Sequence, residues 1–186
     1  MKGSIKMNSK EITLGGIMVA LTSIILYLTS LIPINTLTIL TIASAIIPIC
    51  IIRSDVKTAI FVYIASTIIA FFIVPINISI LYAIFFGIYG IVKFFAERSR
   101  SKLEVLYKIG FFNIAFIIGF IIFQNVLGIN VIKGVEEILY RFISSDIKGI
   151  AFALFLIIAN LVFFIFDYAL TLIISFYMDR IHKKSK

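Results

Sequence analysis

One carboxylate, Asp167, lies well inside a long apolar stretch of the sequence. A charged side chain is costly in hydrocarbon, so such a residue faces the interior of a helix bundle and has a partner there, or is protonated. Asn113 is expected at a similar depth in the preceding apolar stretch and is a candidate partner. The pair would form a proton or cation relay. Alternatively, it would be a structural hydrogen bond between helices, or Asp167 would lie near the inner headgroups. We favour the structural interpretation because we expect no second charge within the membrane.

A second set of polar residues is neutral and is expected toward the outer half of the same stretches. Hydroxyl and amide groups among aromatic side chains are typical of small-molecule pockets, which are mostly apolar with a few placed polar groups. Amides also join membrane helices, and tyrosines favour membrane interfaces, so a structural role remains open for each. The candidate substrate-binding residues are Tyr27, Asn35, Asn77, Tyr82, Gln124, Asn125 and Asn160.

Sequence signatures of catalysis are missing. The chain contains no GxxxxGK[ST], GxSxG or HExxH motif. His182 is the only histidine and Cys50 the only cysteine, so no histidine or multi-cysteine metal site can form. We therefore expect a protein that is not an enzyme and that holds neither a metal ion nor a cofactor.

The composition indicates the elements that must position these residues. Of 186 residues, 62% are hydrophobic and 14% are charged, and the mean hydropathy is +1.17. A soluble chain this short could not bury so much apolar surface. The apolar stretches are long enough for membrane helices and too continuous for barrel strands. We predict an all-α polytopic membrane protein, with residues 1–186 as a single integral membrane domain in contact with the lipid bilayer.

Charged and proline-containing turns separate six apolar stretches of the sequence, and we predict that each stretch is a membrane span. They cover approximately residues 12–32, 37–52, 58–74, 78–95, 109–129 and 149–177. Residues 1–11 would precede the first span, and residues 179–186 would form a basic tail.

The basic residues predict the orientation of the spans. Under a six-span arrangement, 14 of the 17 Lys and Arg residues, Lys93 and Lys108 included, are assigned to the side that holds both termini, and three to the other. None is assigned to the membrane interior. Basic residues concentrate in cytoplasmic loops, so we predict a cell-membrane protein with both termini cytoplasmic, and we attribute the net charge of +8 to this bias rather than to nucleic-acid binding.

The outer segment 130–148 separates the last two spans and has apolar residues at helical spacing, with charges between them. This pattern predicts a short amphipathic helix at the outer interface. Such a helix would be either an ordinary surface helix or a lid over a binding site.

Small residues in the first span predict a close contact with another helix. Gly16 and Ala20 are four residues apart and share one helical face, which lets a second helix approach closely. The partner helix would belong to this chain or to another protein.

With its size, its six spans and its cytoplasmic termini, the chain resembles the substrate-binding S components of energy-coupling factor (ECF) transporters. The opening KEITLGGIMVALT, from Lys10 to Thr22, resembles the basic start and small-xxx-small first helix of that family. The short proline-containing first outer loop and the longer segment between spans five and six are also similar.

The resemblance implies a function that no single residue establishes. Members of that family bind a vitamin or related micronutrient near the outer face. They associate with a transmembrane coupling protein and two cytoplasmic ATPases. The S component is thought to topple in the membrane to release its substrate. The family's coupling contact, an AxxxA face of the first span, maps to Gly16 and Ala20, with glycine in place of the first alanine. Two alternatives remain open: a non-transporting scaffold of cell-envelope or sporulation machinery, and an ion-coupled carrier or lipid-handling protein that uses Asp167.

Overall fold

The computed structural model describes residues 8–98, 103–139 and 147–184, and within these ranges the backbone is helical apart from short connections. The prediction of an all-α membrane protein is confirmed, because six helical segments are long and apolar enough to cross a bilayer. They are α1 (Ser9–Leu31), α2 (Thr36–Arg53), α3 (Val56–Ile73), the composite segment Ile76–Arg98, α6 (Glu104–Asn125) and α8 (Ile147–Lys184).

The fourth span is a composite of three pieces. It begins as α4 (Ile76–Leu81), passes through a π-helical turn (Tyr82–Phe86) and continues as α5 (Gly87–Arg98). A π-turn leaves a backbone carbonyl without its usual helical donor, and such turns are frequent at functional positions. Here the Tyr63 hydroxyl donates to the Ala83 carbonyl at 2.7 Å. A side chain of α3 therefore satisfies the irregular backbone of the fourth span.

The second helix is the centre of the bundle. It contacts α1, α3, α5 and α8, and a larger share of its span is buried than of any other span. Pro48 lies inside this helix and packs against Gly90 of α5. A Cβ added at Gly90 would lie 2.6 Å from Cδ of Pro48, so glycine is needed for these helices to approach so closely.

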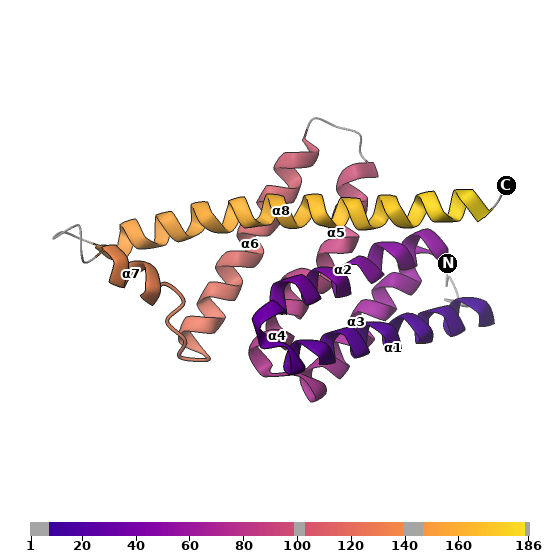
Figure 1. Ribbon diagram of the computed structural model, residues 1–186, viewed down its shortest axis with the longest axis horizontal. Helices are drawn as coiled ribbons and strands as arrows, with labels where there is room; N and C mark the ends of the chain where they lie inside the picture. The colour runs from indigo at the N-terminus through magenta and orange to yellow at the C-terminus, as the bar shows by residue number, and fades with distance from the viewer. Residues whose placement is uncertain (1–7, 99–102, 140–146, 185–186) are drawn as a thin grey trace, which may run out of the picture.

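The first and last helices begin and end as an even number of spans requires. In Figure 1 the start of α1 and the end of α8 lie toward the same end of the molecule, and α7 (Lys133–Leu139) lies at the opposite end, against the start of α8. The assignment of the shared end to the cytoplasm remains a prediction from the charge distribution.

The last helix is longer than its predicted span. It has 38 residues, and at about 1.5 Å per residue it extends for about 57 Å. The hydrocarbon core of a bilayer is only about 30 Å thick. One or both ends of α8 therefore extend beyond the hydrocarbon, and Figure 1 shows this helix running the length of the molecule.

The predicted amphipathic segment 130–148 is partly described. It contains the short helix α7, in which Lys133 and Glu137 form an exposed ion pair at 3.8 Å. Ile132, just before α7, is buried. Residues 140–146 of this segment, and residues 1–7 and 185–186 of the two termini, lie outside the described parts.

Candidate functional site

Asp167 of α8 is the centre of a charged network between three helices. One carboxylate oxygen, Oδ1, accepts from Nζ of Lys93 in α5 at 2.5 Å and from the Tyr89 hydroxyl at 2.8 Å. The other oxygen, Oδ2, lies 3.4 Å from Nζ of Lys108 in α6. Lys93 also donates to Oγ1 of Thr171, one turn further along α8, at 2.8 Å. The carboxylate therefore joins α5, α6 and α8.

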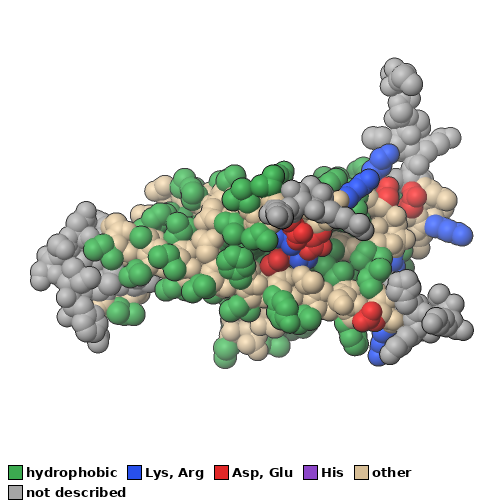
Figure 2. Space-filling view, turned by 90° about the horizontal axis from the view of Figure 1, so that it is seen from above, with side chains coloured by type: hydrophobic (Ala, Val, Ile, Leu, Met, Phe, Trp, Pro, Cys, Tyr) green, Lys and Arg blue, Asp and Glu red, His purple; other side chains and the backbone are tan. Residues whose placement is uncertain are grey.

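Two glutamates extend the network toward the ends of α5 and α6. Nζ of Lys108 lies 2.9 Å from Glu97 and 2.6 Å from Glu104, and Nζ of Lys93 lies 2.8 Å from Glu97. The Lys93 side chain is 2% exposed, whereas Asp167 is 21% and Glu97 42% exposed. The network therefore runs from a dry interior to an accessible rim. Figure 2 shows acidic and basic side chains gathered midway along one face, among apolar side chains.

Both buried lysines of the network have acidic partners. Lys93 pairs with Asp167 and Glu97, and Lys108 pairs with Glu97, Glu104 and Asp167, so that the more exposed carboxylates carry the surplus negative charge. A buried charge is tolerated when it is paired and its remaining donors are satisfied, whereas loss of one partner leaves an uncompensated charge. The arrangement can hold three helices in register, or can exchange a proton through its accessible rim.

This network corrects two predictions from the sequence. The charge count places Lys93 in a loop, but it is buried within α5 and pairs with Asp167, so a second charge does lie within the bundle. Lys108, which the same count places in a loop, is buried at the start of α6. The sequence does contain a signal that Lys93 is a paired residue within a span. Lys93 falls inside the predicted span 78–95 and lies four residues before Glu97, at the spacing of a helical ion pair.

Asn113 has a different partner from the one predicted. Its amide and that of Asn160 donate to each other, at 3.2 and 3.1 Å, across α6 and α8. Each side-chain NH₂ also donates to a carbonyl one turn earlier in its own helix. The predicted pairing of Asn113 with Asp167 is therefore replaced by an Asn113–Asn160 pair. Asn160 is thereby engaged between helices rather than free to bind a ligand.

An aromatic cluster surrounds the network. The Phe85 ring lies 5.1 Å from Phe166 and 5.3 Å from Tyr89, and Phe112 stacks on Phe163 at 4.6 Å. This packing between α5, α6, α8 and the π-turn excludes water from the Lys93 side of the network. A low dielectric strengthens the attraction between the paired charges and raises the cost of separating them.

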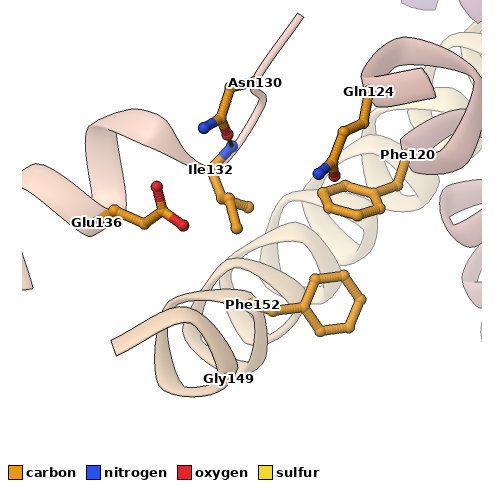
Figure 3. A pocket seen from close by; sticks show the side chains of 7 residues that line it. All are labelled: Phe120, Gln124, Asn130, Ile132, Glu136, Gly149 and Phe152. Carbon is orange, nitrogen blue, oxygen red and sulfur yellow. Dashed lines mark hydrogen bonds between the residues drawn. The ribbon is translucent and has the colours of Figure 1, made fainter. Parts of the chain in front are cut away.

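A second candidate site is a pocket of about 410 Å³ between α6, α7 and α8. Its lining residues come from the end of α6, the segment around α7 and the start of α8, and Figure 1 shows α7 at the end of the molecule opposite the start of α1. Figure 3 shows the amides of Gln124 and Asn130, the Glu136 carboxylate and the rings of Phe120 and Phe152 around it. The rings lie 5.1 Å apart, and Oδ1 of Asn130 accepts from the Ile132 amide at 3.2 Å. The mixture of rings and placed polar groups suits a small organic ligand.

The predicted binding residues do not gather in one place. Of the seven, Gln124 alone is among the side chains that line this pocket. The others occupy separate positions: Tyr27 is half exposed on α1, Asn35 ends a short 3₁₀ turn, Asn77 is the second residue of α4, and Asn125 ends α6. Tyr82 is fully buried, and its hydroxyl lies 2.9 Å from that of Ser66.

The small-residue face of α1 is open to the surroundings. Gly16 and Ala20 are exposed, and a Cβ at Gly16 would meet nothing within 4 Å. The neighbouring Gly15 instead packs against Thr58 and Val62 of α3. The internal contact of α1 therefore uses Gly15, and the Gly16/Ala20 face is unoccupied among the described residues.

Similarity to known proteins identifies a family of predicted membrane proteins. The family described as "Predicted membrane protein (DUF2232)" matches residues 20–147. No curated protein matches the chain. No solved structure matches it.

Proposed function

The chain belongs to the DUF2232 family of predicted membrane proteins, and we propose that it is a substrate-binding membrane subunit that takes up a small organic nutrient. The observation that carries this proposal is the pocket between α6, α7 and α8, which has the volume and lining typical of small-molecule sites. Gln124, a residue selected from sequence, lines this pocket together with Glu136 of the short helix α7.

The chemistry of the pocket indicates what it would bind. Phe120 and Phe152 supply ring faces, and Gln124 and Asn130 supply amides that donate and accept. Glu136 supplies a carboxylate. We expect a ligand with a flat or apolar ring and a hydrogen-bond donor or cationic group, as many vitamins and their precursors have.

The energy for uptake would come from other proteins. The sequence has no nucleotide-binding P-loop. From the resemblance to ECF S components, we propose a transmembrane coupling protein and cytoplasmic ATPases as partners. The exposed Gly16/Ala20 face of α1 supports this proposal, because it is a smooth surface on which a second helix could pack.

Ligand binding is tested on purified protein by thermal stabilisation against a panel of vitamins and nucleobases. One compound is expected to raise Tm, and Glu136→Gln should weaken its binding at least tenfold because it removes the pocket carboxylate. Glu137→Gln is the matched control, since Glu137 is exposed and pairs with Lys133 instead. If no compound stabilises the protein, or if both variants weaken binding equally, the proposal that a ligand binds in this pocket is contradicted.

The coupling contact is tested separately by co-purification with an ATPase module. Gly16→Leu is expected to lose the partner and to retain ligand binding, because it blocks only the open face of α1. Gly110→Leu on α6 is the control, since a Cβ there also meets nothing within 4 Å. Capture of envelope-assembly proteins without an ATPase would support the scaffold alternative.

A further inference from the structure

A second pocket, of about 380 Å³, lies at the end of the bundle that holds both termini. It is formed where α1 begins and α2 ends. Its polar lining comes from Lys10, Arg53, Ser9 and Thr13, and its apolar lining includes Leu14 and Ile17. The pocket thus combines two cations from different helices with two hydroxyls and an aliphatic wall.

The guanidinium of Arg53 is held in place by a residue of α8. Its Nε donates to the Tyr177 hydroxyl, and its carbon lies 5.4 Å from the centre of that ring. A cation over an aromatic face is attracted by the ring quadrupole. Four of its five N–H donors remain available, because Arg53 makes no other hydrogen bond within the described parts of the chain. Its orientation is therefore determined before any ligand arrives.

The positive charge at this pocket is uncompensated. In the parts of the chain that the structure describes, neither Lys10 nor Arg53 pairs with a carboxylate. The acids nearest in sequence have other partners: Glu11 accepts from the Asn8 amide in the capping box at the start of α1, and Asp55 accepts from the Thr58 amide at the start of α3. By contrast, Lys93 and Lys108 are fully engaged in the network around Asp167. Lys10 and Arg53 are both exposed, so within the described residues no carboxylate competes with an incoming anion for them.

The apolar side of the pocket continues along the membrane-facing surface of α1. Ile17 is 62% exposed, and Leu21 and Ile24 follow on the same side of the helix at 45% and 61%. A soluble anion would make no use of this stripe. An amphiphile with a phosphate head and a hydrocarbon tail complements both parts.

We propose that this pocket binds the headgroup phosphate of an anionic phospholipid. The phosphate lies between Lys10 and Arg53, where an arginine fork and an ammonium suit its oxygens. The Ser9 hydroxyl flanks it, whereas the Thr13 hydroxyl donates to the Ser9 carbonyl at 2.9 Å. One acyl chain runs along Ile17, Leu21 and Ile24. The lipid thereby bridges the start of α1 to α2 and, through Tyr177, to α8.

Native mass spectrometry of the full chain tests this site. Protein purified in a mild detergent is mixed with phosphatidylglycerol or with phosphatidylcholine, and retained lipid adducts are counted. The wild-type protein is expected to retain one phosphatidylglycerol at concentrations at which phosphatidylcholine is lost. Lys10→Gln/Arg53→Gln should weaken retention at least tenfold. Lys57→Gln is the matched control, because Lys57 is an exposed cation after α2 that does not line the pocket.

A single variant and a soluble probe distinguish a phospholipid site from a site for soluble anions. Lys10→Gln alone leaves the Arg53–Tyr177 contact intact and is expected to weaken retention by severalfold, so the result does not depend on the folding of the double variant. Equal retention of phosphatidylcholine, unchanged retention by the double variant, or equal weakening by Lys57→Gln would overturn the proposal. So would thermal stabilisation by millimolar inorganic phosphate equal to that by phosphatidylglycerol, which would indicate a soluble-anion site. Binding of a nutrient at the α6–α8 pocket is unaffected by any of these outcomes.

Discussion

Buried serines in this bundle differ in whether each hydroxyl has a partner. Ser66 donates to the Val62 carbonyl at 2.7 Å and lies 2.9 Å from the Tyr82 hydroxyl. Ser44 is equally buried, but within the described structure its hydroxyl has no hydrogen-bond partner. A buried polar group without a partner carries its desolvation cost uncompensated.

Ser44→Ala is therefore expected to stabilise the protein, by about 1 kcal/mol, since it removes an unsatisfied hydroxyl. Ser66→Ala is expected to destabilise it by about 1–3 kcal/mol, because the Tyr82 hydroxyl loses its partner. Thermal unfolding of both variants in the same detergent measures the difference. A loss of stability in Ser44→Ala would show that the hydroxyl is satisfied.

Asp55 caps the start of α3 outside the membrane-spanning segments. Its Oδ1 accepts from the Thr58 amide at 2.7 Å, and hydrogen bonds from Thr58 lower the pKa of its carboxyl below the ordinary value. A group with a depressed folded-state pKa stabilises the fold above its unfolded pKa, and this contribution is lost as pH falls through the folded value.

Replacement of this cap has a defined pH dependence. At neutral pH, Asp55→Ala is expected to cost about 1 kcal/mol, as is usual for the loss of an N-cap. The difference from wild type should shrink as pH falls below about 4, the range in which the unfolded carboxyl titrates. Unfolding measured at pH 7 and at pH 3 tests this, and a constant difference would contradict the carboxylate cap. Asp55→Asn, which retains a capping oxygen, is the control.

At the scale of elements, the contact between α2 and α5 depends on one glycine. Gly90 lies against Pro48 and Ile47, and an added Cβ would approach Cβ of Ile47 to 3.1 Å as well as the proline ring. Because these atoms belong to buried residues and to a proline ring, they cannot move aside easily.

Gly90→Ala is accordingly expected to destabilise the bundle by about 1–3 kcal/mol through overpacking, despite the higher helix propensity of alanine. Gly110→Ala on α6 is the control, since nothing lies within 4 Å of its added Cβ. That variant should be neutral or slightly stabilising. Equal Tm values for the two variants would contradict the close approach of α2 and α5.

At the scale of the whole molecule, the network around Asp167 connects segments that are 74 residues apart in the chain. Lys93→Met or Asp167→Asn alone is expected to cost about 1.5–3 kcal/mol, because each removes the charged hydrogen bond between the two residues, while Lys93 retains Glu97 and Asp167 retains Lys108. The double variant should cost less than the sum of the two, since both charges are removed together.

A double-mutant cycle of unfolding in detergent measures this coupling. Additive costs would show that Lys93 and Asp167 do not stabilise the fold as a pair. The same variants test the alternative that the protein is an ion-coupled carrier that uses Asp167. If the protein is an ion-coupled carrier, its relay requires Asp167 itself. The double variant should then lose activity even where it remains folded. If uptake or ligand binding persists in the double variant, the network is structural.

Local sequence determined the helices and the spans. Apolar length, charged turns and prolines predict all six spans, because a helix in lipid must satisfy its own backbone hydrogen bonds and needs about 20 apolar residues. The same local pattern identifies Gln124 as a polar group near the outer end and Gly16 as part of a small-residue face. The basic residues predict the sidedness, which the fold leaves as a prediction.

Tertiary structure decided which side chains meet. The pairing of Lys93 with Asp167, of Asn113 with Asn160 and of Arg53 with Tyr177 joins residues 47 to 124 positions apart. Helical periodicity specifies the face of each residue on its own helix, but not which neighbouring helix that face will contact or at what depth. The prediction for Lys93 is wrong for this reason: one lysine near the end of an apolar stretch fits a loop as well as a buried ion pair, until packing brings a carboxylate to it.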